Sequence, residues 1–327
     1  MTHQLIATDW DDVTPDLDPG IDTHCHLWEL GLAKRGGLTP AFGSMYRTFS
    51  PGDLSLAAAP CGIRACILIE SGKTIEESTA MENVAASSDL IAAFAPYVDL
   101  ASPSLEKELD SWSTNPKVRA VRARFEGHPD PDILARPETL RGIVKIAERG
   151  IILEFLVRAA HLKHILTIYE QIPHLKSVIE HMAKPALEDK SDRSEWESGM
   201  KALATDTNIA CKLSFSPRLE EFAGLLSAPG KGWPVEAIKP FVGFLLEWFG
   251  PTRLMWGSDW PVTLLVASYR DTLRGMKAAL GTLQSGQEVM LFRSTAAEFY
   301  GLGPLQNPPA PAGTAKKSSG LRGQRQQ

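Results

Sequence analysis

Ile-Asp-Thr-His-Cys-His, at Ile21–His26, and Leu-Met-Trp-Gly-Ser-Asp-Trp-Pro-Val, at Leu254–Val262, are the two stretches that decide the fold. Each contains an apolar run that predicts a strand, and each places polar side chains where that strand ends. Alternate residues of a strand share a face, so His24 and His26 point the same way. If a barrel closes the first strand against the last, Asp259 reaches the same pole. This arrangement is typical of a hydrolase site in which a metal or a carboxylate assists.

Short apolar segments that predict strands alternate along the chain with segments that predict helices. One helix opens at Pro137 and closes at Gly150, and another runs from about Val235 to Gly250. This alternation predicts parallel strands joined by right-handed crossovers. Eight strands suit a closed α/β barrel better than an open sheet, although a doubly wound sheet shows the same pattern. The strands are expected near residues 20–24, 63–70, 91–100, 118–125, 151–157, 177–181, 209–213 and 253–257.

The composition is that of an ordinary globular protein. The chain has 327 residues, 43 % of them hydrophobic, and a net charge of −5, which gives no electrostatic reason to expect nucleic acid. Its four cysteines form no C-x-x-C pair, so we expect reduced thiols and a cytoplasmic location. We find no signal peptide, and no apolar run approaches the roughly 20 residues that span a bilayer.

The two ends of the chain differ from the middle in composition. Residues 1–19 hold five aspartates and no Lys or Arg, which predicts a solvated acidic lead-in. Residues 304–327 are rich in Pro, Gly, Ser and Gln, carry basic residues but no acid, and predict a disordered tail. We therefore expect a single folded domain over residues 20–303.

Each candidate for chemistry also has a purely structural interpretation. His24 and His26 can cap backbone groups at a strand end instead of binding an ion. His181 follows another short apolar strand and is either a third ligand, a carbonyl-polarising group or a neutral core histidine. Asp259 can act as a general base or as the N-cap of the next helix.

Seven strings in the chain together resemble the amidohydrolase superfamily, in its amidohydrolase-2 branch, and most closely the sugar-lactonase group. The strings retain the family's order and spacing over about residues 20–302. They are Asp-Thr-His-Cys-His-Leu-Trp (22–28), Val-Arg-Ala-Val-Arg (118–122), Leu-Glu-Phe-Leu-Val-Arg (153–158), Glu-His-Met-Ala-Lys-Pro (180–185), Ala-Cys-Lys-Leu-Ser (210–214), Gly-Ser-Asp-Trp-Pro-Val (257–262) and Ala-Ala-Glu-Phe-Tyr-Gly-Leu (296–302).

The resemblance implies a distorted (β/α)₈ TIM-type barrel with a hydrolytic site at the ends of its strands. It implies that four residues form the catalytic centre and hold a divalent metal if one is bound: His24, His26, His181 and Asp259. It assigns substrate contact to Arg122, and less directly to Lys184 and Trp28. Arg124 is added because it shares the strand face of Arg122.

A long segment between the first two strands is a further candidate for substrate contact. Residues 30–51 follow the first strand and should arch over the pocket, since βα loops set specificity in barrels. Tyr46 and Arg47 are the polar residues expected to contact substrate there. The alternative is that the segment's side chains only pack it onto the barrel rim.

Four positions depart from the family pattern. Glu180 and Glu154 stand where the family usually has Asp, Glu70 where it has Gln, and Thr295 where it has Asn. The pole is therefore more acidic than expected. This puts the identity of the substrate in doubt more than the type of reaction.

These observations favour an enzyme that opens a small lactone, a sugar-acid or similar cyclic ester. Asp259 would activate water while the histidines, with or without zinc or manganese, polarise the carbonyl group. The expected partner is a small-molecule substrate, not nucleic acid or membrane, and the sequence does not indicate an oligomeric state. Two alternatives stay open: a metal-dependent, non-oxidative decarboxylase of an aromatic acid, and a non-catalytic binding protein derived from such an enzyme.

Overall fold

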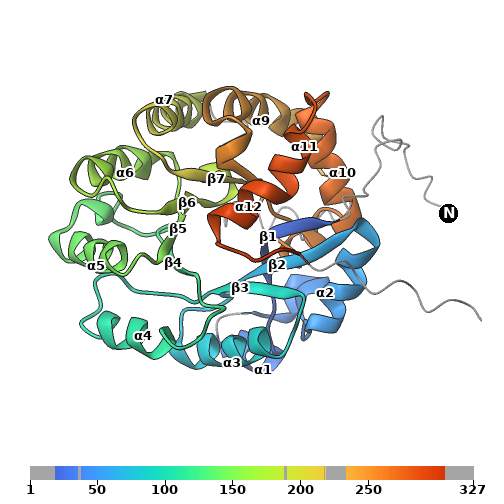
Figure 1. Cartoon of the computed structure of the whole chain (residues 1–327), viewed down its shortest axis with the longest axis horizontal. Coiled ribbons are helices and arrows are strands. Elements are labelled where there is room, and N and C mark those ends of the chain that lie inside the picture. The colour runs from blue at the N-terminus through green and yellow to red at the C-terminus, as the bar shows by residue number, and fades with distance from the viewer. Residues whose placement is uncertain (1–18, 36–37, 188–189, 217, 219–232, 306–327) are drawn as a thin grey trace, which may run out of the picture.

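The computed structural model describes residues 19–35, 38–187, 190–216, 218 and 233–305. Within these residues the chain forms an α/β barrel of parallel strands, surrounded by helices (Figure 1). All eight predicted strands are confirmed. They are β1 (Gly20–His26), β2 (Ile63–Ile69), β3 (Ile91–Ala95), β4 (Ala120–Arg124), β5 (Ile152–Leu156), β6 (Ser177–Ile179), β7 (Ala210–Leu213) and β8 (Leu254–Trp256).

The helices follow the strands in the alternating order that the sequence predicts. α5 begins at Pro137, and α9 ends at Phe249 just before Gly250, as predicted. The acidic lead-in and the basic tail lie outside the described residues, except for Pro19, Pro304 and Leu305. The helices are α1 (Leu30–Arg35), α2 (Pro51–Ala58), α3 (Ile75–Ala86), α4 (Leu105–Trp112), α5 (Pro137–Glu148), α6 (Ala159–Gln171), α7 (Lys190–Asp206), α9 (Val235–Phe249), α10 (Tyr269–Leu280), α11 (Gln287–Val289) and α12 (Thr295–Phe299).

The barrel is distorted because its hydrogen-bonded ladder is interrupted in two places. One sheet runs β1-β2-β3 and the other β4-β5-β6-β7-β8. Single bridges such as Phe94–Val118 join β3 to the approach of β4. Where the residues after β8 meet β1, His26 N–H donates to the Trp260 carbonyl at 2.7 Å and Asp259 N–H donates to the His24 carbonyl at 2.8 Å. The exit of β8 is thereby fixed against the end of β1.

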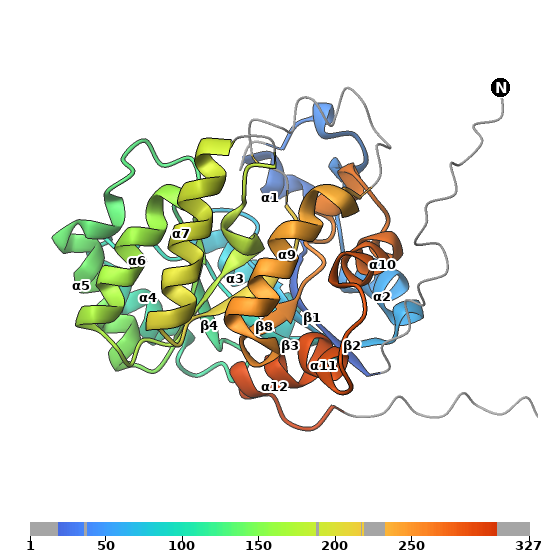
Figure 2. The same ribbon diagram turned by 90° about the horizontal axis from the view of Figure 1, so that it is seen from above.

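The inside of the barrel is filled by small and branched side chains and is covered at one end. Ala65, Ala93 and Ala120 from neighbouring strands lie in this inner core, and Tyr300, just after α12, packs against them. α12 lies across the near end of the barrel in Figure 1, and Figure 2 shows α11 and α12 at the end opposite α1. The N-terminal pole is therefore filled, and the polar residues gather at the C-terminal pole, where barrels place their active sites.

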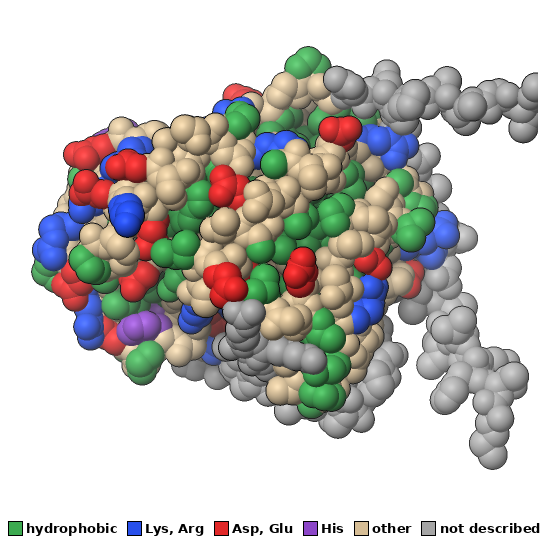
Figure 3. Space-filling view, turned by 90° about the horizontal axis from the view of Figure 1, so that it is seen from below, with side chains coloured by type: hydrophobic (Ala, Val, Ile, Leu, Met, Phe, Trp, Pro, Cys, Tyr) green, Lys and Arg blue, Asp and Glu red, His purple; other side chains and the backbone are tan. Residues whose placement is uncertain are grey.

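The outer face carries charges of both signs. Acidic and basic side chains lie next to one another on the face shown in Figure 3, with apolar side chains between them. In the part of the chain that the structure describes, no helix combines the length and apolar character that a bilayer crossing requires.

Two helical glycines test the packing of the outer helices. A Cβ on Gly142 in α5 would lie 2.1 Å from the Leu100 carbonyl oxygen, a backbone atom that cannot easily move. We expect Gly142→Ala to lower the free energy of unfolding by about 1–3 kcal/mol. A Cβ on Gly243 in α9 meets nothing within 4 Å, so Gly243→Ala should raise that free energy by about 0.5–1 kcal/mol through helix propensity. Urea denaturation of both variants checks this, and equal effects would contradict the packing described.

Candidate active site

Three imidazole rings converge on one carboxylate at the C-terminal pole. The Oδ1 atom of Asp259 lies 3.3 Å from Nε2 of His26, 3.6 Å from Nε2 of His24 and 3.9 Å from Nε2 of His181. The two Nε2 atoms of His24 and His26 are 3.1 Å apart. All four residues are buried. The structure therefore brings together the four residues that the sequence selects from three separate parts of the chain.

Asp259 is held in place by the loop that leaves β8. It has a φ of 55°, a left-handed conformation that costs free energy for any residue with a Cβ. Its N–H donates to His24 and its carbonyl accepts from Thr263 N–H at 3.1 Å. Because both backbone groups are bonded, the strained conformation is fixed, and the side chain points at the histidines.

The preceding residue, Ser258, is bound to a buried carboxylate on β1. Asp22 accepts from the N–H of Ser258 at 2.9 Å, from its hydroxyl at 2.6 Å and from the hydroxyl of Tyr269 at 2.9 Å. It also accepts from the N–H of His24 at 3.0 Å. Burial raises the pKa of Asp22, against these hydrogen bonds, which lower it. Asp22 thus links the end of β1 to the exit of β8.

His181 lies in a turn that sequence patterns did not reveal. The expected strand ends at Ile179, and His181, Met182, Ala183 and Lys184 all have φ between 45° and 56°, although none is glycine. Trp196 Nε1 donates to the Met182 carbonyl at 2.6 Å, and a Ser214 hydroxyl lies 2.8 Å from His181 Nδ1. Strain of this kind is stored at functional sites. The turn directs both His181 and Lys184 toward the cavity.

The spacing of His24, His26 and Asp259 suits a single divalent ion. A tetrahedral ion with bonds of about 2.0–2.1 Å holds its ligand atoms roughly 3.4 Å apart. The ligand atoms of His24, His26 and Asp259 lie 3.1, 3.3 and 3.6 Å from one another, and His181 Nε2 lies 3.9 Å from Asp259 Oδ1 at the edge of this group. Among the described residues, Asp259 Oδ2 has no hydrogen-bond partner. Imidazole and carboxylate are ligands that zinc and manganese accept. These residues are a candidate metal centre.

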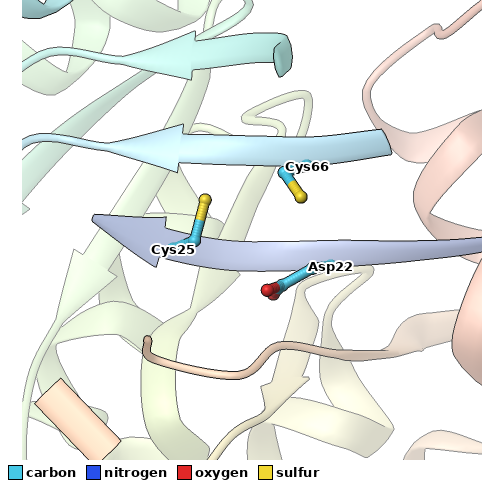
Figure 4. A group of neighbouring side chains, drawn as sticks. All are labelled: Asp22, Cys25 and Cys66. Atoms are coloured by element: carbon cyan, nitrogen blue, oxygen red, sulfur yellow. The ribbon is translucent and has the colours of Figure 1, made fainter. Parts of the chain in front are cut away.

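A second group of potential ligands does not fit an ion. Asp22, Cys25 and Cys66 have ligand atoms close to one another. Figure 4 shows the two sulfur atoms between β1 and β2, with the Asp22 carboxylate on the other side of the β1 ribbon. Both Asp22 oxygens already accept hydrogen bonds, and burial raises the pKa of both thiols. We assign this group a structural role.

Burial also decides the charge of two histidines in the centre. It lowers the pKa of both His24 and His181 well below the usual value. The neighbouring His181 lowers the pKa of His24 further. The neighbouring Lys184 lowers the pKa of His181 further. Both rings are therefore neutral at neutral pH. Nδ1 of His26 lies 3.1 Å and 3.0 Å from the carbonyl oxygens of Ile69 and Glu70, which can only accept, so His26 carries a proton on Nδ1.

The arginines predicted to contact substrate are paired with the acids that depart from the family pattern. Arg122 donates to Glu180 Oε2 from Nε and from one terminal nitrogen, at 2.9 Å and 2.7 Å, and to Glu70 Oε1 from the other at 3.0 Å. Arg124 lies 3.6 Å from Glu70 Oε2, and its side chain is 24 % exposed. Both arginines line the cavity, and Arg124 is the more accessible.

The cavity above the four groups has a volume of about 240 Å³, enough for a small molecule. Lys184 lines it and donates to Glu126 at 2.7 Å, and Trp28 lines it while donating from Nε1 to the Arg47 carbonyl at 2.7 Å. One part of the wall is apolar, and another is polar. The apolar part includes Ala33, Leu38, Phe42, Met45 and Val262.

The segment after β1 reaches over the cavity, as expected, but through apolar side chains. Tyr46 and Arg47 are not among the residues that line the cavity. Arg47 is exposed, donates to Asp53 at 2.8 Å and lies over the Phe49 ring at 3.8 Å. Asp53 in turn caps α2 by accepting from Ser50 N–H. Substrate contact by Tyr46 and Arg47 stays a prediction. The backbone carbonyl of Arg47 accepts a hydrogen bond from Trp28 Nε1.

Several residues near the centre were not singled out by the sequence. Glu126 and Glu77 line the cavity, and Lys212 lies behind His24. The sequence could have indicated Lys212, because a lysine inside the apolar strand Ala-Cys-Lys-Leu must be buried together with an acidic partner. That partner is Glu154, which also accepts from the Tyr300 hydroxyl at 2.8 Å. Thr295, the remaining departure, donates to the Pro251 carbonyl, away from the cavity.

Comparison with known proteins agrees with this arrangement. The sequence profile of the amidohydrolase family matches residues 21–302. The chain belongs to this family. It is 32 % identical to an L-fucono-1,5-lactonase of Burkholderia ambifaria over 254 residues, which cover 77 % of this chain and 83 % of the relative.

Solved structures of amidohydrolases share the fold. An amidohydrolase from Burkholderia multivorans with bound zinc is 26 % identical, has a TM-score of 0.76, and is matched over 87 % of this chain and 100 % of its own. A 2,6-dihydroxybenzoate decarboxylase from Rhizobium is 12 % identical with a TM-score of 0.58, over 87 % of this chain and 99 % of its own, so it shares the fold alone. The family and the predicted barrel are both confirmed.

Glu77 offers a test of the cavity's electrostatics. Burial, with the nearby Glu70, raises its pKa from 4.5 to about 7. Between those values the folded protein retains a proton that the unfolded chain releases, so stability falls as the pH rises through this window and is level above it. In the Glu77→Gln variant, the fall in the free energy of unfolding across this pH window should be smaller by up to about 3 kcal/mol.

The measurement is urea denaturation of wild type and variant across the same pH window. Glu76→Gln, on the exposed face of the same turn of α3, is the matched control and should follow the wild type. A Glu77→Gln variant that loses stability with pH as steeply as the wild type would overturn this electrostatic account of the cavity.

Proposed function

We propose that this amidohydrolase opens the ring of a small lactone by adding water to its ester carbonyl. The observation that carries the proposal is the convergence of His24, His26 and His181 on Asp259 at the base of a small cavity. The similarity to an L-fucono-1,5-lactonase supports the choice of a ring ester as substrate. Sugar-acid lactones are the substrate class we propose.

Asp259 is the residue proposed to move the proton. Its carboxylate takes a proton from a water molecule as the water oxygen attacks the carbonyl carbon. The ring carbon–oxygen bond then breaks, and Asp259 returns the proton to the leaving alkoxide, which gives an open-chain hydroxy acid. Oδ2 of Asp259, which has no hydrogen-bond partner in the part of the chain that the structure describes, can accept from this water.

His181 is proposed to stabilise the negative charge that develops on the carbonyl oxygen. It lines the cavity and can donate from Nε2 when its Nδ1 accepts from the Ser214 hydroxyl. His26, with its proton on Nδ1, and His24, which contacts His26, would polarise the carbonyl only through a bound ion. A zinc or manganese ion bound by His24, His26, His181 and Asp259 would polarise the carbonyl and lower the pKa of a bound water. Dependence on a metal, and the cytoplasmic location, stay predictions.

The substrate side of the cavity favours an uncharged ring. Among the described residues, each cation that lines the cavity has an acid beside it: Glu180 and Glu70 for Arg122, Glu70 for Arg124, and Glu126 for Lys184. A carboxylate substrate would need a cation without such a partner. We therefore rank the lactonase above the decarboxylase, and propose that Arg124, Lys184 and Trp28 bind hydroxyl groups or the ring face.

The test is a pH-indicator assay with L-fucono-1,5-lactone and a panel of other sugar and aromatic lactones, because hydrolysis releases a proton. We expect wild type to open at least one sugar lactone and Asp259→Asn to lower kcat about 10²–10⁴-fold. Asp206→Asn, at the exposed end of α7, is the matched control and should retain the wild-type rate.

Two results would overturn the proposal. One is wild-type turnover in the D259N variant, because a residue other than Asp259 would then act as the base. The other is release of carbon dioxide from a benzoate-type acid with no lactone opened, which would establish the decarboxylase instead.

A further inference from the structure

Lys212, in the middle of β7, has a fully buried ammonium group that donates into the candidate active site. Its Nζ lies 2.7 Å from the Thr23 carbonyl oxygen, contacts the Glu154 carboxylate and lies 3.4 Å from Nδ1 of His24. An ammonium has three N–H donors and no acceptor. Three acceptors therefore match three protons, and one of them is His24.

This contact determines where His24 carries its proton. A donor cannot point at another donor, so Nδ1 must present its lone pair to Lys212, and the ring proton lies on Nε2. Glu180 Oε1 also faces Nδ1, but at 3.8 Å it is beyond hydrogen-bond reach. Arg122 holds the other oxygen of Glu180, which keeps that carboxylate at its present distance.

The neighbouring histidine has the complementary proton position. His26 carries its proton on Nδ1, which faces two carbonyl oxygens, so its Nε2 presents a lone pair. The 3.1 Å contact between the two Nε2 atoms is then a hydrogen bond from His24 to His26. Lys212, His24, His26 and the carbonyl oxygens at the end of β2 form a chain in which every donor meets an acceptor.

We propose that Lys212 is a positioning residue that holds His24 in the Nε2–H form and thereby opposes metal binding at the centre. An ion shared by His24, His26 and Asp259 needs the Nε2 lone pair of His24, and that form would turn an Nδ1–H toward the ammonium. The spacing of the side chains thus suits an ion, whereas the proton on His24 does not. The metal-free, hydrogen-bonded arrangement is the form that this chain favours.

The first experiment measures metal binding directly and does not depend on the reaction. The Kd for Zn²⁺ is obtained by competition with a chromophoric chelator for wild type, for Glu154→Asp, and for the double variant Lys212→Met with Glu154→Gln. The single variant retains a carboxylate for Lys212 and so retains the ammonium, and the double variant removes the ammonium without leaving a buried acid unpaired. We expect Glu154→Asp to bind as wild type does, and the double variant at least about tenfold more tightly.

A Kd for the double variant equal to that of Glu154→Asp would overturn the proposal, since Lys212 would then only neutralise Glu154. The two experiments are independent of lactone hydrolysis, so their failure and the failure of the proposed function are distinguishable.

The second experiment uses the wild-type protein and holds even if the double variant does not fold. Two-dimensional ¹⁵N NMR of metal-free protein with labelled histidine distinguishes a protonated from an unprotonated ring nitrogen, and His24 is assigned from its absence in His24→Gln. We expect Nε2 of His24 to carry the proton and Nδ1 to be bare. A proton on Nδ1, directed at Glu180, would overturn the proposal.

Discussion

The four hydrogen bonds to the buried carboxylate of Asp22 are the constraint on which the site depends. The ladder between β8 and β1 is broken, so the strands alone do not fix the position of Asp259. Asp22 binds Ser258 on the exit of β8 and the backbone of His24 on β1. Burying a carboxylate costs several kcal/mol, and charge-assisted hydrogen bonds offset that cost. Asp22, together with the backbone hydrogen bonds of His26 and Asp259, therefore positions the proposed catalytic carboxylate and the first two histidines.

The interior of the pole is built from paired charges. Arg122 lies between Glu180 and Glu70, and Lys212 is bound to Glu154. In a low-dielectric interior each of these ions would be strongly destabilising alone. These pairs surround the rings of His24 and His181, which burial keeps neutral by lowering their pKa. The site is thus organised before substrate arrives, which is the condition for electrostatic stabilisation of a developing charge.

The sequence predicted the parts of this structure that depend on local pattern. Strand periodicity and the order of the elements gave the barrel, and His24, His26 and Asp259 follow from their places at strand ends. The left-handed turn at His181 could not be foreseen, because no glycine marks it and distant residues such as Trp196 hold it. The pairing of Lys184 with Glu126 and the role of Arg47 in supporting Trp28 depend on contacts between segments that no local pattern records.

Asp259 and the histidines are proposed to act together on one ester carbonyl. A crystal structure of the D259N variant soaked with a sugar lactone tests it most directly. We expect the ring carbonyl oxygen within about 3 Å of Nε2 of His181, with the side chain at position 259 beside the carbonyl carbon. A lactone bound with its carbonyl turned away from these histidines, or seated outside the cavity, would contradict it.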